Sequence, residues 1–317
     1  MSDKKIKILF MGTAEFGLPT LEILRDRFNL ETIITNYDKP SGRGLKINTS
    51  PVKEFAVKNN IDFLQPKNLK NEKFVEKIKN LKPDFIIVVA FRMIPKCIWQ
   101  IPKYGTINLH ASLLPDYRGS APINWVLINN EKETGVTTFF IDEKIDTGDI
   151  LIQKKIKIDN IINAGELHDK LKVIGAKAIN DTIIGVYRNS ISQSTQENRK
   201  NIKTAYKFDK ENIKINWNLG GIDIYNKIRG LNPFPGARTN INSKNGDSRR
   251  IIIYESEYLA ENHNLKNGLI FSENKMIKIT CSDGYIFIKN LKFEGKKRMD
   301  IKSFLNGFNI EKYNKAT

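Results

Sequence analysis

The apolar positions in the first half of the sequence fall into short runs separated by amphipathic stretches. Runs of strand length cover residues 5–11, 31–35, 84–90 and 105–110, whereas residues 18–27, 50–59 and 72–81 show the apolar spacing of helices. Strands that alternate with helices predict β-α-β units around a mostly parallel sheet. Because such sheets bind ligands beyond the carboxyl ends of their strands, we expect the chemistry in the loops after residues 90 and 110.

The pattern changes in the second half. Residues 135–141 and 149–158 are typical of a strand pair and residues 164–186 of a long helix, and residues 189–201 then turn polar without periodicity. A helical stretch at 221–230 and short alternating runs at 250–254, 268–271, 276–281 and 285–289 follow. Such short strands predict a small barrel or sandwich, with an OB-like barrel as one option. We therefore predict the α/β class: a Rossmann-like, mostly parallel sheet in residues 1–188, a linker at 189–207 and a small C-terminal β-barrel domain at 208–317.

The composition is that of a globular protein. Of the 317 residues, 40% are hydrophobic and 27% are charged, which excludes a chain that is disordered throughout. No window approaches the roughly 18 apolar residues of a membrane span. Cys97 and Cys281 belong to no paired-cysteine motif, so neither a disulfide framework nor a thiolate zinc site is expected. We expect a cytoplasmic protein that contacts no membrane.

The formal net charge of +17 is large and positive. An excess of Lys and Arg favours a polyphosphate partner such as a nucleic acid. Residues 201–317 carry 21 basic and 12 acidic side chains (+9), and the longer segment 1–200 carries 31 and 23 (+8), so the C-terminal part is the more basic per residue. A+T-rich coding would also enrich Lys, Ile and Asn, so the charge alone leaves both explanations open.

Residues 105–122, GTINLHASLLPDYRGSAP, are the most informative stretch for chemistry. In a strand that ends at His110, Asn108 lies two positions earlier and projects from the same face. An amide donor beside an imidazole can stabilise an acyl oxyanion, and the imidazole can exchange protons near neutral pH. A purely structural Asn and His are the alternative. We favour chemistry because an apolar-then-proline loop with Arg118 and Gly119 follows.

Residues 141–150, IDEKIDTGDI, place Asp142, Asp146 and Asp149 in a turn between two predicted strands. Acidic turns are usually solvated, and we expect this for two of the three carboxylates. Asp146 precedes Thr147 and Gly148, where a tight turn can aim a carboxylate inward. A carboxylate near the imidazole would favour its charged form and could accept a proton from an incoming amine.

The pattern N-L-H-x-S-L-L-P-x-x-R-G-x-x-P, followed by I-D-x-G-D, resembles the folate-dependent formyltransferase family. The stretches MGTAEFGLPTLE, DKPSGRGLKINTSPVK, IVVAF, INWNL and IRGLNPFPGAR extend the resemblance over nearly the whole chain. The shared machinery of this family is an Asn, a His and an Asp, and the resemblance places it on Asn108, His110 and Asp146. It implies transfer of the formyl group of 10-formyltetrahydrofolate to the α-amino group of initiator methionyl-tRNA by a monomer that needs no metal.

The resemblance also implies which residues contact the substrates. The pterin of the reduced folate is expected between the loop at 88–94 and the turn at 139–146. The residues expected to bind the folate are Val89, Ala90, Phe91, Ser112, Leu113, Leu114, Pro115 and Asp142. Those expected to bind tRNA are Lys39, Arg43, Lys46 and Arg118, with Arg43 nearest the terminal base pair of the acceptor stem. A solvated basic loop is the alternative for residues 36–49, and the C-terminal barrel is expected to contact phosphates.

The chain departs from the family pattern at three positions. Arg92 and Ala111 stand where glycine is usual, and Asn216 replaces a usual Asp. Arg92 borders the expected folate pocket, so we expect it to point to solvent or to contact the glutamate tail of the folate. Two other functions remain open from the sequence: formyl transfer to a sugar-nucleotide amine, and RNA binding without catalysis.

Overall fold

The computed structural model describes residues 3–41, 46–197 and 199–317, with the backbone alone at 39–41 and 46–48. The chain divides into two compact units, which we describe separately. Residues 1–119, 133–156 and 168–204 form the first unit, and residues 120–132, 157–167 and 205–317 form the second.

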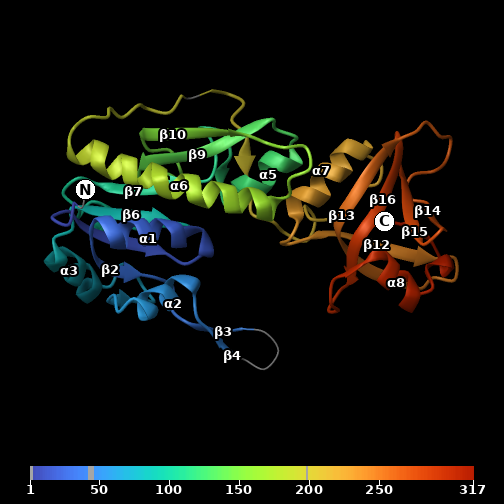
Figure 1. Cartoon of the computed structure of the whole chain (residues 1–317), viewed down its shortest axis with the longest axis horizontal. Coiled ribbons are helices and arrows are strands. Elements are labelled where there is room, and N and C mark those ends of the chain that lie inside the picture. The colour runs from blue at the N-terminus through green and yellow to red at the C-terminus, as the bar shows by residue number, and fades with distance from the viewer. Residues whose placement is uncertain (1–2, 42–45, 198) are drawn as a thin grey trace. The chain divides into compact units, whose positions relative to one another are not determined.

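A seven-stranded sheet is the centre of the first unit. Its strands are β1 (Lys7–Gly12), β2 (Asn29–Ile34), β5 (Phe63–Leu64), β6 (Phe85–Val89), β7 (Thr106–His110), β9 (Glu133–Phe140) and β10 (Ile150–Lys157). They lie in the order β10-β9-β7-β6-β1-β2-β5 (Figure 1). β5, β2, β1, β6 and β7 are parallel, and β9 is antiparallel to β7. The predicted mostly parallel sheet is confirmed. Because the chain order reverses beside β1, the ends of β1 and β6 form the usual ligand-binding edge of such a sheet.

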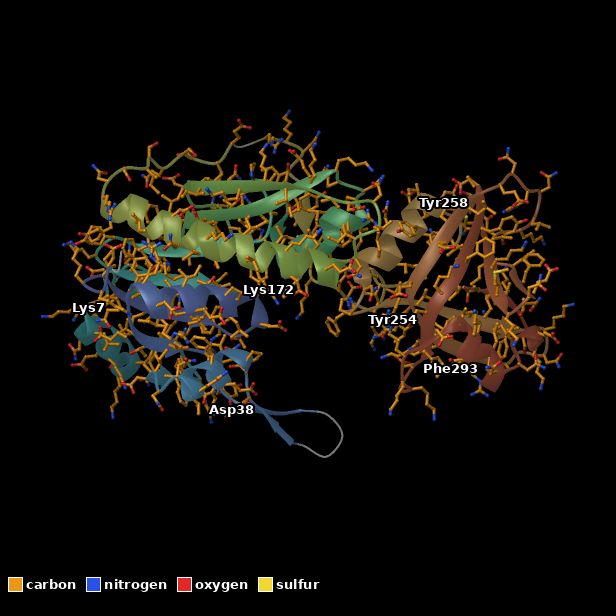
Figure 2. The ribbon with its side chains drawn as sticks, viewed as in Figure 1. Lys7, Asp38, Lys172, Tyr254, Tyr258 and Phe293 are labelled. Atoms are coloured by element: carbon orange, nitrogen blue, oxygen red, sulfur yellow. The ribbon has the colours of Figure 1, made fainter. Side chains whose placement is uncertain are left out.

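Helices lie on both faces of this sheet. They are the 3-10 helix η1 (Glu15–Gly17), α1 (Leu18–Arg27), α2 (Pro51–Lys58), α3 (Glu72–Leu81), α4 (Lys96–Trp99) and α6 (Ala164–Tyr187). Ile78 of α3 and Ile98 of α4 pack on the face that carries Val88. On the opposite face, a Cβ added to Gly175 of α6 would lie 2.7 Å from Leu109 of β7. Lys172 of α6, labelled in Figure 2, donates a 2.9 Å hydrogen bond to Glu15 of η1.

The second unit contains an antiparallel sheet. Its strands are β12 (Ala237–Ser243), β13 (Ser248–Ala260), β14 (Ile270–Glu273), β15 (Met276–Cys281), β16 (Gly284–Phe293), β17 (Met299–Asp300) and β18 (Tyr313–Ala316). The order is β14-β15-β16-β13-β12-β18, with β17 paired to β16. Leu269 and Lys315 form a β-bridge, and the Ala316 amide donates to the Gly268 carbonyl. These contacts join the first and last strands, so the sheet is nearly closed and the predicted barrel is confirmed.

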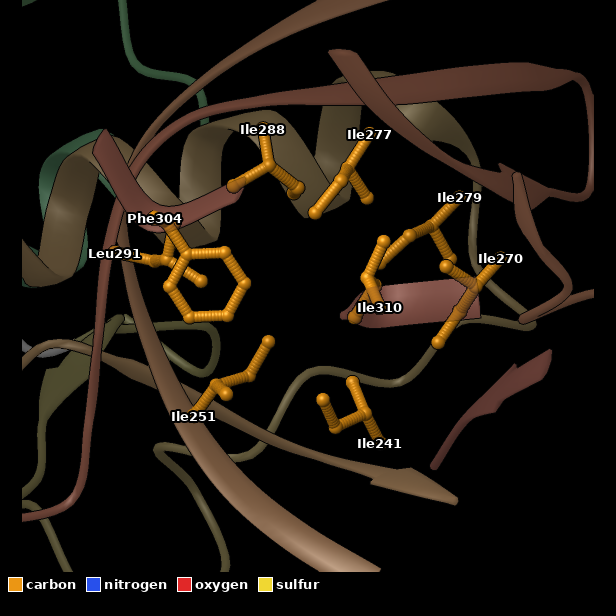
Figure 3. Close-up of a pocket in the computed structure, with 9 residues that line it drawn as sticks. All are labelled: Ile241, Ile251, Ile270, Ile277, Ile279, Ile288, Leu291, Phe304 and Ile310. Carbon is orange, nitrogen blue, oxygen red and sulfur yellow. The ribbon is translucent and has the colours of Figure 1, made fainter. Parts of the chain in front are cut away.

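Aliphatic side chains fill the interior of this barrel, as Figure 3 shows. The side chains that point into one small cavity are Ile241, Ile251, Ile270, Ile277, Ile279, Ile288, Leu291, Phe304 and Ile310. No polar residue is among them, so the interior stabilises the barrel by hydrophobic burial and a polar ligand would bind outside it.

The remaining elements are short. They are α5 (Pro122–Ile128), α7 (Gly221–Leu231), α8 (Ile301–Gly307), the 3-10 helix η2 (Ile310–Lys312) and four two- or three-residue strands, β3 (Lys39–Ser41), β4 (Lys46–Asn48), β8 (Arg118–Gly119) and β11 (Thr204–Ala205). In the described part of the chain, no helix has the length and apolar character needed to span a bilayer.

Candidate active site

His110 and Asp146 lie together at the carboxyl end of β7. His110 ends this strand and is buried, with 6% of its surface exposed. Its Nδ1 lies 3.7 Å from Oδ2 of Asp146, and its Nε2 lies 2.8 Å from the carbonyl oxygen of Tyr117. Because a carbonyl oxygen can only accept, Nε2 carries a hydrogen and donates it to Tyr117. Nδ1 is therefore the nitrogen that faces the carboxylate and can exchange a proton there.

Asp146 lies in the turn between β9 and β10 with a φ of 55°, in the left-handed region that few non-glycine residues adopt. Its Oδ2 accepts a 2.9 Å hydrogen bond from the backbone N–H of Gly119 in β8. Two residues later the turn is too tight for a side chain, because a Cβ on Gly148 would lie 1.7 Å from the carbonyl oxygen of Phe140. Backbone geometry and this one amide thus hold the carboxylate on the side of His110.

Asn108 precedes His110 by two residues on β7, so the two side chains project from the same face of the sheet. In the register of the sheet it pairs with Val88 of β6 and Phe139 of β9. Asn108 is half-buried, and no residue in the described part of the chain forms a hydrogen bond with its side-chain amide. The amide can therefore donate to a ligand beside His110 without breaking an existing bond.

The last residue of β6 and the segment after this strand contain three of the residues expected to bind the folate. They are Val89, which is buried, Phe91, which is half-buried, and Ala90, which is exposed and has a φ of 49°. The guanidinium of Arg92 donates to the backbone carbonyls of Pro66 and Lys67, the latter at 3.1 Å. Arg92 therefore holds a neighbouring loop through its backbone carbonyls. The expectation that this side chain points to solvent or contacts the glutamate tail did not include such a contact.

The loop after His110 carries four more expected folate contacts: Ser112 and Leu114, which are buried, and Leu113 and Pro115, which are half-buried. Thr137 of β9 holds this loop, since its hydroxyl donates to the Ser112 carbonyl at 2.7 Å and accepts from the Leu114 amide at 3.1 Å. The exposed Asp142 accepts from the Lys144 amide and the Thr147 hydroxyl, so its carboxylate closes the turn that bears Asp146.

The residues expected to contact tRNA are only partly described. Arg43 and the side chains of Lys39 and Lys46 lie outside the described residues. Arg118 is half-buried, and its Nε and Nη2 donate to Oε1 of Gln196 at 3.1 and 2.6 Å. On the second unit, Arg298 and Lys292 lie 4.6 and 5.7 Å from the ring centre of Tyr254, labelled in Figure 2.

The sequence did not indicate the backbone groups and the amide that surround His110 and Asp146. The Tyr117 carbonyl, the Gly119 amide and the Gln196 side chain all contact the pair or its turn. The Arg118-Gly119 pair in the loop after His110 is a usable signal for Gly119, whereas nothing in the polar stretch 189–201 distinguishes Gln196. Among the described residues, no group of three or more His, Cys, Asp or Glu side chains could hold a metal ion.

Two family models match this sequence. One, described as formyl transferase, covers residues 4–183, and the other, described as formyl transferase C-terminal domain, covers residues 207–309. The sequence is 48% identical to the methionyl-tRNA formyltransferase of Flavobacterium johnsoniae, over 96% of each chain. It is 43% identical to the methionyl-tRNA formyltransferase of Clostridium novyi, over 96% of this chain and 98% of that protein.

Solved structures also share the fold. WlaRD, a sugar 3N-formyl transferase determined with dTDP and 5-N-formyl-THF, matches with a TM-score of 0.63 at 22% identity, over 92% of this chain and 99% of that one. HypX from Aquifex aeolicus in complex with tetrahydrofolic acid matches with a TM-score of 0.64 at 15% identity, over 96% of this chain and 48% of that one. At these identities the likeness concerns the fold and does not identify the acceptor.

Proposed function

Because this chain belongs to the formyl transferase family, we infer that it transfers the formyl group of 10-formyltetrahydrofolate to the α-amino group of methionyl-tRNA. The observation that carries this conclusion is the similarity to methionyl-tRNA formyltransferases along nearly the whole chain, the C-terminal unit included. The product, N-formylmethionyl-tRNA, serves translation initiation. Sugar formyl transferases share the fold at much lower identity, so the fold alone does not favour a sugar amine.

We propose that Asn108, His110 and Asp146 carry out the transfer. The neutral amine attacks the formyl carbon, a C–N bond forms, and the formyl oxygen gains negative charge. The Asn108 amide and the N–H at Nδ1 of His110 donate to this oxygen and stabilise it. Asp146 stabilises the imidazolium and accepts, through water, the proton that the amine loses. When the bond to the folate nitrogen breaks, that nitrogen takes up one proton, so the proton count balances.

The 3.7 Å separation of Nδ1 and Oδ2 supports this assignment. It exceeds a hydrogen-bond length but lies within ion-pair range, so the carboxylate can stabilise an imidazolium while the N–H at Nδ1 stays available to the formyl oxygen. The bond from Nε2 to the Tyr117 carbonyl supports it as well, because it fixes the ring orientation and leaves Nδ1 for the reaction.

The proposal extends to the substrate contacts and the domains. The folate contacts are Val89, Ala90, Phe91, Ser112, Leu113, Leu114, Pro115 and Asp142, and the tRNA contacts are Lys39, Arg43, Lys46 and Arg118. Residues 1–188 are the catalytic domain, 189–207 the linker and 208–317 the tRNA-binding barrel, in a monomer located in the cytoplasm. Cations beside Tyr254 support phosphate contacts by the barrel, since Lys and Arg bind nucleic-acid backbones.

The test is a competition between acceptors. The purified protein is incubated with 10-formyltetrahydrofolate, a mixture of aminoacylated tRNAs and a sugar-nucleotide amine, and the formylated product is identified by mass spectrometry. We expect formyl-methionyl-tRNA from the wild-type protein, and a rate of its formation lower by on the order of 100-fold or more with His110→Ala at the same protein concentration. Formylation of the sugar-nucleotide amine alone would overturn the acceptor, and formylation of neither amine would overturn the function.

A further inference from the structure

The polar segment after α6 is bound to the first unit beside the proposed catalytic residues. Its residues 189–197 form no helix, yet Ser194 and Ile150 exchange two backbone hydrogen bonds, of 2.8 and 2.9 Å. Two residues later Gln196 is buried, with 8% of its surface exposed, although residues 192–195 are all exposed. A glutamine in such a segment is ordinarily solvated, so its burial calls for a physical reason.

The amide of Gln196 uses its full hydrogen-bonding capacity. Its Nε2 donates to the backbone carbonyls of Asp146 at 3.0 Å and Gly148 at 2.8 Å. Its Oε1 accepts from Nε and Nη2 of Arg118, at 3.1 and 2.6 Å. A primary amide has two N–H donors and one oxygen with two lone pairs, so all four positions are filled.

These four bonds connect the two segments on either side of the Asp146 carboxylate: the turn that carries it and the β8 segment that donates a hydrogen bond to it. On one side they fix the turn, because one carbonyl belongs to Asp146, whose φ is 55°, and the other to Gly148 two residues later. On the other side they hold Arg118, whose chain neighbour Gly119 donates its amide to Oδ2 of Asp146. Movement of either side would lengthen the approach of Oδ2 to His110.

We propose that Gln196 is a positioning residue of the transfer reaction, which holds the Asp146 turn and β8 at the separation that places the carboxylate beside His110. This inference rests on the proposed function, because it takes Asp146 and His110 as the reacting pair. Gln196 touches neither the imidazole of His110 nor the carboxylate of Asp146, and it acts on that carboxylate through the backbone carbonyls at residues 146 and 148.

A simpler role would be to fasten the polar segment to Arg118. Gln196→Glu separates the two roles, because the glutamate keeps the contact to Arg118 as an ion pair but replaces the donating Nε2 with an oxygen. That oxygen would face two carbonyl oxygens, and these acceptors repel one another. Fastening alone therefore predicts an active Gln196→Glu protein, whereas positioning predicts one in which the Asp146 turn has moved.

The experiment compares Gln196→Glu and Gln196→Ala with Gln193→Ala, an exposed glutamine of the same segment. Initial rates of methionyl-tRNA formylation give kcat and both KM values, and hydrogen exchange at the Gly119 amide reports its bond to Asp146 whether or not the acceptor is correct. We expect both Gln196 variants to lose on the order of 10- to 100-fold in kcat, with KM values near wild type, because displacement by about 1 Å has such effects. The Gly119 amide should exchange faster in both, and Gln193→Ala should match the wild type.

Wild-type kcat and wild-type exchange at Gly119 in Gln196→Glu would overturn the positioning role, even if Gln196→Ala were impaired. An equal rise in both KM values without a change in kcat would also overturn it. If the wild-type protein formylates no methionyl-tRNA, the proposed function fails. Unchanged exchange at the Gly119 amide in both Gln196 variants would separately refute the positioning role of Gln196, whichever acceptor the protein uses.

Discussion

A single methyl group at position 148 should disable the site without touching a reacting group. In Gly148→Ala the new Cβ would lie 1.7 Å from the carbonyl oxygen of Phe140 and 2.8 Å from its carbonyl carbon. Real Cβ atoms essentially never come closer than 3.0 Å to another atom, so the distance to the oxygen is 1.3 Å too short. The atom in the way is backbone in β9, which cannot rotate aside as a side chain can, so the turn itself must move.

The displacement of the turn can be compared with the distances it controls. Asp146 is two residues away, its bond from the Gly119 amide is 2.9 Å, and its approach to His110 is 3.7 Å. A shift of the turn by more than 1 Å would break the hydrogen bond from Gly119, and it would lengthen or misalign the approach of Asp146 to His110. We expect kcat for formylation to fall on the order of 100-fold. Overpacking should also lower the free energy of unfolding by about 1 to 3 kcal/mol.

The assay is steady-state formylation of methionyl-tRNA, run well below the melting temperature of the variant so that both proteins are folded. Gly307→Ala is the matched control, because a Cβ at that position meets nothing within 4 Å. Its kcat should equal that of the wild type. A folded Gly148→Ala protein with wild-type kcat would show that the turn can relax without moving Asp146, and it would refute the proposed dependence of the reaction on this geometry.

Three further outcomes can be measured on the same protein. Replacement of His110 by Ala should cost on the order of 100-fold or more in kcat, because an oxyanion donor is lost, and near-normal turnover would remove its role. The kcat/KM for charged tRNA should fall as salt is raised, and a salt-insensitive value would argue against phosphate contacts. Burial raises the pKa of Cys281 to about 11 and, with the Asp283 contact, that of Tyr258 to about 12. Because folded protein then holds protons that the unfolded chain has lost, urea stability should decrease between pH 8 and 11, and a stability that increases over this range would contradict the assignment.

The sequence predicted most elements whose own residues carry a periodic pattern. The strands of the first sheet other than the two-residue β5, together with α6 and the strands β13 to β16, follow from alternating or continuous apolar runs. β12 was missed because it begins within NPFPGAR, where turn residues dominate the local signal. β18, with the sequence YNKA, has no strand pattern of its own and is set by its pairing with β12. Pairing with strands distant in the sequence thus determines the elements that the local sequence does not predict.

The residues of the candidate site could likewise be predicted from the sequence only in part. A period of two places Asn108 and His110 on one face, and the Thr147-Gly148 turn indicates an inward carboxylate at Asp146. The Tyr117 carbonyl and the Gly119 amide could not be predicted, because every residue has such groups and only the fold decides where they point. Gln196 is far along the chain in a segment without periodicity, so its contacts depend on the path of the whole segment.

Backbone conformation links these observations. Among the described residues, non-glycine residues with positive φ are mostly Asn or Lys, and the exceptions are Ala90, Tyr117 and Asp146. All three lie in the candidate site: Ala90 follows β6, the carbonyl of Tyr117 accepts a hydrogen bond from His110 Nε2, and Asp146 faces Nδ1. Residues held in this region cost of order 1 to 3 kcal/mol each and persist where the surrounding structure fixes them. For Tyr117 and Asp146 these are the contacts of Gly119, Thr137 and Gln196, which fix the loop after His110 and the turn between β9 and β10. Tertiary contacts therefore stabilise loop conformations that the isolated segments would not keep.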